Sequence, residues 1–163
     1  MNLLLGPVSM ADRKEIVDIF NHYIETSFAA FPDHPLPYDA FEAILNKCKG
    51  YPTVTVKEES GAVVGFGLLH AYNPFPVFSG TAELTYFIKP EWTGRGIGTM
   101  MLDHLCQKAR DRGLTTLLAS ISSLNDQSLQ FHRCRGFSQC GCLRNVGRKR
   151  NQTFDIIYMQ IFL

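Results

Sequence analysis

The chain has 163 residues, 45% of them hydrophobic and 19% charged, which suits one domain that buries most of its apolar surface. Its 16 basic and 15 acidic residues give a net charge of +1, so no strong field draws it to nucleic acid or to an anionic membrane. No apolar run approaches the roughly 20 residues that span a bilayer, and the N-terminal segment lacks the pattern of a signal peptide. We therefore expect a single cytoplasmic domain, residues 1–163, that acts on a small molecule.

The cysteines support this interpretation of the compartment. There are five, an odd number at spacings that match neither a disulfide framework nor a zinc site. Free thiols in a reducing compartment, with no bound metal, are the simplest expectation.

The first part of the chain alternates between strand and helix patterns. Residues 1–5 are an apolar strand, and Ser9 can cap a helix from residue 10 or 11 to about residue 26. The next stretch, residues 28–39, holds three prolines and is expected to be a loop. A second helix is predicted at 40–49.

The middle of the chain continues the alternation. Residues 53–57 and 63–70 form a hairpin around a polar, glycine-bearing turn. A proline-containing loop, NPFPVFSG, separates this hairpin from a strand at 81–88. A helix follows at 96–112, and Gly113 ends it.

The last part completes a mixed sheet. A strand at 115–121 is followed by a short helix at 125–135 and by closing strands at 140–146 and 154–162. The strand before the helix at 96–112 and the strand after it form a βαβ unit, so these two strands should be parallel with a right-handed crossover. Hairpins on either side make the sheet mixed, and the fold class is α/β.

The most informative segment is LTYFIKPEWTGRGIGT, from Leu84 to Thr99. A strand enters a turn with glycines at 94, 96 and 98, and a helix follows. Such a turn exposes consecutive backbone N–H groups at a helix N-terminus, where the helix dipole also favours an anion. The missing β-carbons let a phosphate approach the backbone. The turn therefore predicts a phosphate site.

The order of these motifs resembles a known superfamily. A strand, a P-x-x-x-G-x-G-x-G turn, a helix, a strand and then NDQSLQFHRCRGF are similar to the GCN5-related N-acetyltransferases (GNAT), which transfer an acetyl group from acetyl-CoA to an amine. Within it, NHYIETS, AELTYFIKP and RNVGRKRNQTFDIIYMQ resemble the phosphinothricin acetyltransferase group. The resemblance covers nearly the whole chain. The resemblance implies a mostly antiparallel sheet of about six to seven strands with about four helices, in which the βαβ unit carries the pyrophosphate loop. It also implies a homodimer.

The resemblance assigns one set of residues to acetyl-CoA. Backbone N–H groups of the turn would hold the pyrophosphate, with Arg95 adding charge, and the strand before the turn would pair with the pantetheine arm. Asn125 would contact that arm, although an asparagine there also serves as a helix N-cap. The cofactor-binding residues are Tyr86, Phe87, Ile88, Gly94, Arg95, Gly96, Ile97, Gly98, Thr99 and Asn125.

Two side chains are candidates for proton transfer. Glu83 stands where the group has its proposed catalytic glutamate. It would take a proton from the substrate, because an ammonium ion cannot attack a thioester. Alternatively, Glu83 faces solvent at the start of its strand. His132 stands where many superfamily members have a tyrosine that protonates the CoA thiolate, and imidazole can act as acid or base; alternatively it is a surface histidine. Strand alternation puts Glu83 and Tyr86 on opposite faces.

The resemblance also implies an acceptor site. A basic hairpin could bind a carboxylate or phosphinate, or be a solvated charge run. Thr153 stands where the group has a tryptophan, so one wall of the pocket differs and phosphinothricin itself is not carried over. The expected substrate-binding residues are Glu25, Thr26, Phe31, Thr85, Arg144 and Lys149.

The expected activity is direct transfer of an acetyl group to the amine of a small substrate. An amino acid or an analogue of the phosphinothricin, methionine sulfone or methionine sulfoximine type is expected, and another small amine stays open. No cysteine stands where an acyl-enzyme would need one. Two alternatives stay open: a non-catalytic acyl-CoA-binding sensor of the same fold, and a nucleotide-binding module, against which the absence of GxxxxGK[ST] argues.

Overall fold

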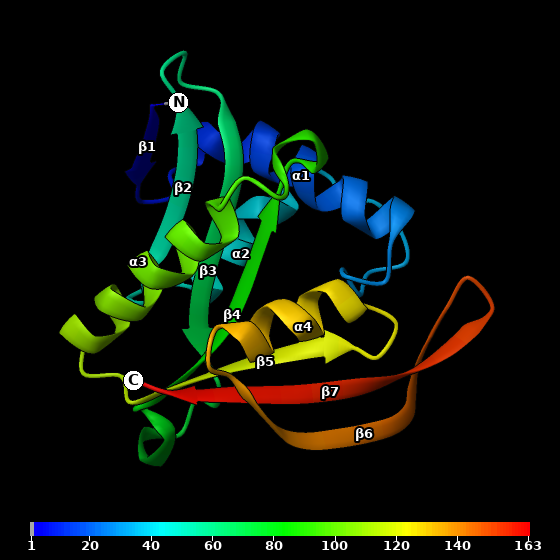
Figure 1. The fold of residues 1–163 in the computed structure, drawn as a ribbon. Coiled ribbons are helices and arrows are strands. Elements are labelled where there is room, and N and C mark those ends of the chain that lie inside the picture. The colour runs from blue at the N-terminus through cyan, green and yellow to red at the C-terminus, as the bar shows by residue number, and fades with distance from the viewer. Residues whose placement is uncertain (1) are drawn as a thin grey trace.

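A computed structural model describes residues 2–163, whose strands form one seven-stranded sheet in the order β1-β2-β3-β4-β5-β7-β6. Figure 1 shows α3 crossing one face of the sheet, with α1 and α2 behind it. The strands are β1 (Leu3–Gly6), β2 (Thr53–Glu58), β3 (Val63–Ala71), β4 (Thr81–Ile88), β5 (Thr116–Ser122), β6 (Ser138–Lys149) and β7 (Gln152–Phe162). The helices are α1 (Arg13–Thr26), α2 (Ala40–Lys47), α3 (Ile97–Asp111) and α4 (Asp126–Cys134), with 3₁₀ turns η1 (Met10–Asp12), η2 (Pro76–Phe78) and η3 (Pro90–Trp92).

The pairing of β4 with β5 decides where the sheet opens. These strands are parallel, and every other neighbouring pair within residues 2–163 is antiparallel. Their pairing spans only Thr81 to Glu83 on β4, after which the two strands diverge. The predicted mixed, mostly antiparallel sheet with one βαβ unit is confirmed, and the divergence leaves one edge of the second half of β4 without a strand partner.

Local signals account for most element ends. The first helix begins as the 3₁₀ turn η1, because the Asp12 carboxylate accepts the Ser9 N–H at 2.9 Å and tightens the first turn. Asn125 caps α4 by accepting the Ser128 N–H at 3.2 Å. The first expected strand is β1, which starts at Leu3; Met1 lies outside the described residues.

The closing hairpin is longer than predicted. β6 starts two residues before the expected position 140 and continues to Lys149, and its register with β7 shifts twice. Asn145 adopts a positive φ of 54°, and its N–H donates to Asp155 Oδ1 at 2.8 Å. Such bulges break the two-residue period that marks a strand in sequence. Arg150 and Asn151, both with positive φ, form the tight turn between the strands.

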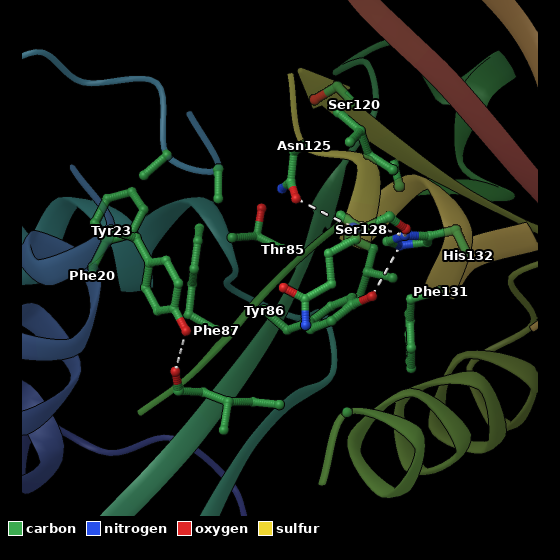
Figure 2. Close-up of a pocket in the computed structure, with 18 of the residues that line it drawn as sticks. Phe20, Tyr23, Thr85, Tyr86, Phe87, Ser120, Asn125, Ser128, Phe131 and His132 are labelled. Carbon is green, nitrogen blue, oxygen red and sulfur yellow. Dashed lines mark hydrogen bonds between the residues drawn. The ribbon is translucent and has the colours of Figure 1, made fainter. Parts of the chain in front are cut away.

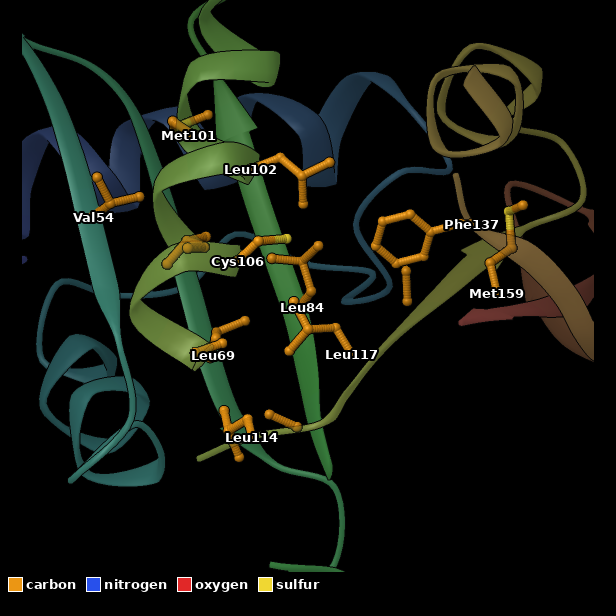
Figure 3. Close-up of a cluster of buried hydrophobic side chains, with 14 of the residues drawn as sticks. Val54, Leu69, Leu84, Met101, Leu102, Cys106, Leu114, Leu117, Phe137 and Met159 are labelled. Carbon is orange, nitrogen blue, oxygen red and sulfur yellow. The ribbon is translucent and has the colours of Figure 1, made fainter. Parts of the chain in front are cut away.

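Two apolar clusters hold the helices on the sheet. The larger lies between α3, α4 and the sheet, and Figure 3 shows Leu84, Leu102, Cys106 and Leu117 packed within it. The second lies between α1, α2 and the other face, around the fully buried Phe41. All five cysteines are free thiols.

A truncation at Leu105 tests the larger cluster. Leu105 is fully buried on α3, and a β-carbon placed on Gly67 of β3 would lie 2.8 Å from its Cδ1. We expect Leu105→Ala to lower the free energy of unfolding by about 2–5 kcal/mol, because it leaves a cavity where α3 packs on β3. Urea unfolding measures this, with Leu4→Ala as control because Leu4 is 59% exposed. Equal losses in the two variants would contradict the packing described.

Candidate active site

A cavity of about 630 Å³ opens where β4 and β5 diverge. Residues of α1 and its following loop, β3, β4, the glycine turn, β5 and α4 line it. Figure 2 shows that Phe20 and Tyr23 border one side of this cavity and Phe131 and His132 the other, with β4 between them. Its size is typical of a small-molecule or cofactor site.

The glycine turn forms one end of the cavity. Gly94 and Gly96 have left-handed φ angles of 73° and 81°, and a β-carbon added at either would have no atom within 4 Å. Met100 N–H donates to Gly96 O at 3.0 Å, so the N–H groups just before it lack an intrahelical acceptor. The bare backbone and free donors fit a pyrophosphate, as the sequence predicts.

Neighbouring side chains of the turn point elsewhere. Arg95 lies over the Trp92 ring with its guanidinium carbon 4.9 Å from the ring centroid, and it does not line the cavity. Ile97 is buried in the core and presents only its backbone to the turn. Gly98, Thr99 and Asn125 line the cavity.

The second half of β4 forms the cavity floor. Tyr86, Phe87 and Ile88 line it, and the pairing with β5 ends before them. Tyr23 of α1 donates its hydroxyl proton to Ile88 O at 2.6 Å, which ties the helix to the end of the strand. The sequence predicts no role for Tyr23 in the site.

The faces of β4 alternate as predicted. Phe87 packs against the α1 side, with its ring centroid 5.1 Å from that of Phe20, whereas Leu84 and Tyr86 join the cluster around α3. Glu83 lines the cavity at the last position where β4 pairs with β5. Its carboxylate therefore lies where the two strands begin to separate.

His70 is a cavity residue that sequence reasoning missed. It lies directly opposite Glu83 in the β3–β4 register, with Nε2 4.0 Å from Glu83 Oε2. No local signal identifies it, because its position depends on how β3 and β4 pair across the intervening loop of residues 72–80.

His132 is buried, so the interpretation of a surface histidine is wrong: its exposed fraction is 3%. Nδ1 lies 2.7 Å from Ser128 O, and Nε2 lies 3.0 Å from the Tyr86 hydroxyl. Because a carbonyl only accepts, Nδ1 carries the hydrogen and Nε2 accepts from Tyr86. Burial lowers the pKa of His132, against the opposing effect of the Ser128 carbonyl, and raises the pKa of Tyr86, so both are neutral near pH 7.

The expected acceptor residues divide into two groups. Phe31 and Thr85 line the cavity, together with Ala29, Ala30 and Pro32. Glu25 and Thr26 are exposed at the end of α1, Arg144 is exposed on β6, and none of the three lines the cavity.

Lys149 is directed toward a loop. It is 6% exposed, and Nζ donates to Ser27 O at 3.0 Å and to Ala30 O at 2.8 Å. Burial lowers its pKa. Both bonds hold the segment that follows α1, and this segment forms one wall of the cavity. Lys149 therefore supports that wall without lining the cavity itself.

Comparisons with known proteins identify the family of this chain. A sequence model of the Acetyltransferase (GNAT) family matches residues 16–137, and the chain belongs to that family. The L-amino acid N-acyltransferase MnaT of Escherichia coli K12 is 33% identical over 157 residues, covering 94% of this chain and 90% of that protein. The L-methionine sulfoximine/L-methionine sulfone acetyltransferase of Pseudomonas aeruginosa PAO1 is 28% identical, covering 100% of this chain and 96% of that protein.

A solved structure extends the likeness. A GNAT superfamily phosphinothricin acetyltransferase from Sinorhizobium meliloti, in complex with acetyl-CoA, is 25% identical with a TM-score of 0.93, over 100% of this chain and 89% of that one. The predicted resemblance to this group is confirmed, and the chain is an acyltransferase of the N-acetyltransferase type. Within residues 2–163 no three His, Cys, Asp or Glu side chains cluster as metal ligands, and no helix is long and apolar enough to cross a membrane.

A substitution at Gly96 tests the phosphate site. Alanine there would be strained by the left-handed backbone and would put a methyl group on the bare turn, so we expect the Kd for CoA to rise at least about tenfold, or about 1.4 kcal/mol. Isothermal titration calorimetry measures this. Gly61→Ala is the matched control, since Gly61 has a φ of 89° and open space but lies in the β2–β3 turn. Equal affinities in the two variants would contradict a phosphate site at Gly96.

The buried His132 predicts a pH dependence of stability. Because its pKa is lowered in the folded state, the unfolded chain binds a proton more readily below about pH 6.5. The stability that neutral His132 supports is complete above that pH and falls as the pH drops. We expect His132→Gln to show a smaller loss of unfolding free energy between pH 7 and 5 than the wild type, by at most about 1.4 kcal/mol per pH unit. Urea unfolding at each pH measures these losses, and equal losses in the two proteins would refute the prediction.

Proposed function

We propose that this protein transfers the acetyl group of acetyl-CoA to the amine of a small amino acid or amino acid analogue, of the methionine sulfone, methionine sulfoximine or phosphinothricin type. One observation carries the proposal: a single cavity connects the bare glycine turn to a carboxylate at the point where β4 and β5 separate. The names of the relatives support the acceptor class.

The glycine turn and the open edge of β4 bind the cofactor. Acetyl-CoA, when bound, supplies an activated acetyl group. The N–H groups at the start of α3 hold its pyrophosphate, and the unpaired edge of β4 at Tyr86, Phe87 and Ile88 binds the arm as an added strand would. Holding two reactants in line contributes up to roughly 7–11 kcal/mol to such a reaction.

Glu83 acts as the base. An amine near pH 7 is mostly an ammonium ion without a free electron pair, so a carboxylate must first take its proton. Glu83 lines the cavity at the divergence point, with a side chain that is 25% exposed. That exposure leaves its carboxylate accessible to an amine or to one bridging water.

His132 and Tyr86 act at the leaving-group side. They hold one proton between Tyr86 Oη and His132 Nε2 at the cavity wall, opposite the α1 side. We propose that the leaving thiolate takes its proton from solvent, because the Tyr86 hydrogen is already donated to His132 Nε2, and that His132 holds the Tyr86 ring in place beside the thioester. His132 therefore works through Tyr86, since its own Nε2 is occupied. The sensor alternative is not favoured, because the relatives are named as acyltransferases.

Among residues 2–163 that line the cavity there is no lysine or arginine. An acceptor carboxylate therefore finds no cation on the wall formed by Ala29, Phe31 and Thr85. The acceptors tested for activity must therefore include simple amines as well as amino acids. We also propose the single-domain organisation, the cytoplasmic location and the homodimer; the first two rest on composition and the third on resemblance.

Replacing the base tests the function. In a thiol-release assay with acetyl-CoA, we expect turnover with at least one of the L-amino acids, methionine sulfone, methionine sulfoximine, phosphinothricin or a polyamine. Glu83→Gln should then lower kcat about 100-fold or more, with an unchanged Kd for acetyl-CoA, because only proton removal is lost. Glu42→Gln, at an exposed position on α2, is the control. Full turnover by Glu83→Gln would remove the base assignment, and no release with any acceptor would refute the function.

A further inference from the structure

A carboxylate and an imidazole face each other in the cavity, where β4 and β5 begin to separate. His70 and Glu83 are directly opposed in the antiparallel β3–β4 pair, so their side chains emerge on the same face. His70 Nε2 and Glu83 Oε2 lie 4.0 Å apart, and both residues line the cavity.

The orientation of the His70 ring is set by its own strand. Nδ1 lies 3.0 Å from Ala71 O, and because a carbonyl only accepts, Nδ1 carries the hydrogen. Nε2 is then the nitrogen that gains and loses a proton, and it is the one that faces Glu83. The imidazole therefore presents a proton acceptor to the carboxylate.

The other titratable groups on the cavity wall are engaged elsewhere. Tyr23 donates to Ile88 O, and Tyr86 is bonded to His132. In the chain from residue 2 to 163, His70 is the only basic group within 4.0 Å of Glu83. The His70 side chain is 30% exposed, so its ring can exchange protons with solvent.

We propose that His70 is a positioning residue and proton acceptor for Glu83, an inference that rests on the proposed acetyl transfer. Glu83 takes the proton of the acceptor ammonium: the N–H bond breaks, an O–H bond forms at Oε2, and the electron pair stays on nitrogen. The proton then passes from Oε2 to His70 Nε2, across one water or about 1 Å of side-chain movement, and the carboxylate is restored. His70 loses the proton to solvent through its exposed edge.

A double-mutant cycle tests this relay. In the wild-type background His70→Gln should lower kcat about tenfold, with the Kd for acetyl-CoA unchanged. In the Glu83→Gln background the same change should lower kcat less than about twofold, because His70 acts through Glu83. His104→Gln, at a half-buried position on α3 outside the cavity, is the matched control and should leave kcat unchanged. Equal losses in both backgrounds would overturn the proposal.

Two further measurements separate a relay from a structural role. Added imidazole should restore part of the kcat of His70→Ala, and the absence of rescue would count against the relay. By NMR of the protein without substrates, Glu83→Gln should change the chemical shifts of the His70 ring, since the two side chains face each other 4.0 Å apart, while those of His104 stay in place.

The NMR measurement does not depend on turnover. If the wild type released no thiol with any acceptor, the proposed function would fail, yet the chemical shifts of the His70 ring would still show whether His70 and Glu83 face each other. Identical chemical shifts of the His70 ring in the wild type and Glu83→Gln would overturn the pair itself.

Discussion

The site depends on the short parallel pairing of β4 with β5. Only the residues from Thr81 to Glu83 pair with β5, and the strands then separate. Unpaired strand edges are unfavourable in a protein interior, because buried N–H and C=O groups need partners. Here the antiparallel partner β3 continues along the other edge of β4 to Ile88, so the strand keeps its shape while one edge stays open. The opening is therefore a stable feature of the sheet.

Two tyrosine hydroxyls hold the sides of this opening. Tyr23 bonds Ile88 O at 2.6 Å and draws α1 to the end of β4, while Tyr86 bonds His132 at 3.0 Å and draws α4 to the other face. Both bonds are partly buried, and leaving one partner of a buried bond unsatisfied costs about 1–3 kcal/mol. A group that binds against Tyr86 thus meets a hydroxyl whose position is fixed by α4.

The fold was predictable where the signal is local. The bounds of β4 agree at both ends with those expected, and Gly96 and Asn125 mark the starts of α3 and α4 as predicted, because glycine turns and N-caps act on adjacent residues. Features that depend on pairing between distant segments were not predictable from the sequence. Nothing near His70 in sequence shows that it faces Glu83, and the sequence pattern of α4 left the burial of His132 open.

Backbone forms one end of the cavity and packed side chains form the other, and this difference affects how readily the choice of acceptor can change. The proposed cofactor end is lined by backbone, made by glycines whose geometry few substitutions preserve. The proposed acceptor end is held by tertiary contacts: Phe31 stacks on Phe154 with centroids 6.3 Å apart, and Lys149 donates to the carbonyls of Ser27 and Ala30. Packed side chains can be exchanged for others of similar volume at modest cost. A chain of this design can therefore change its acceptor while keeping its cofactor, because the glycine turn takes no part in the contacts that hold the loop after α1.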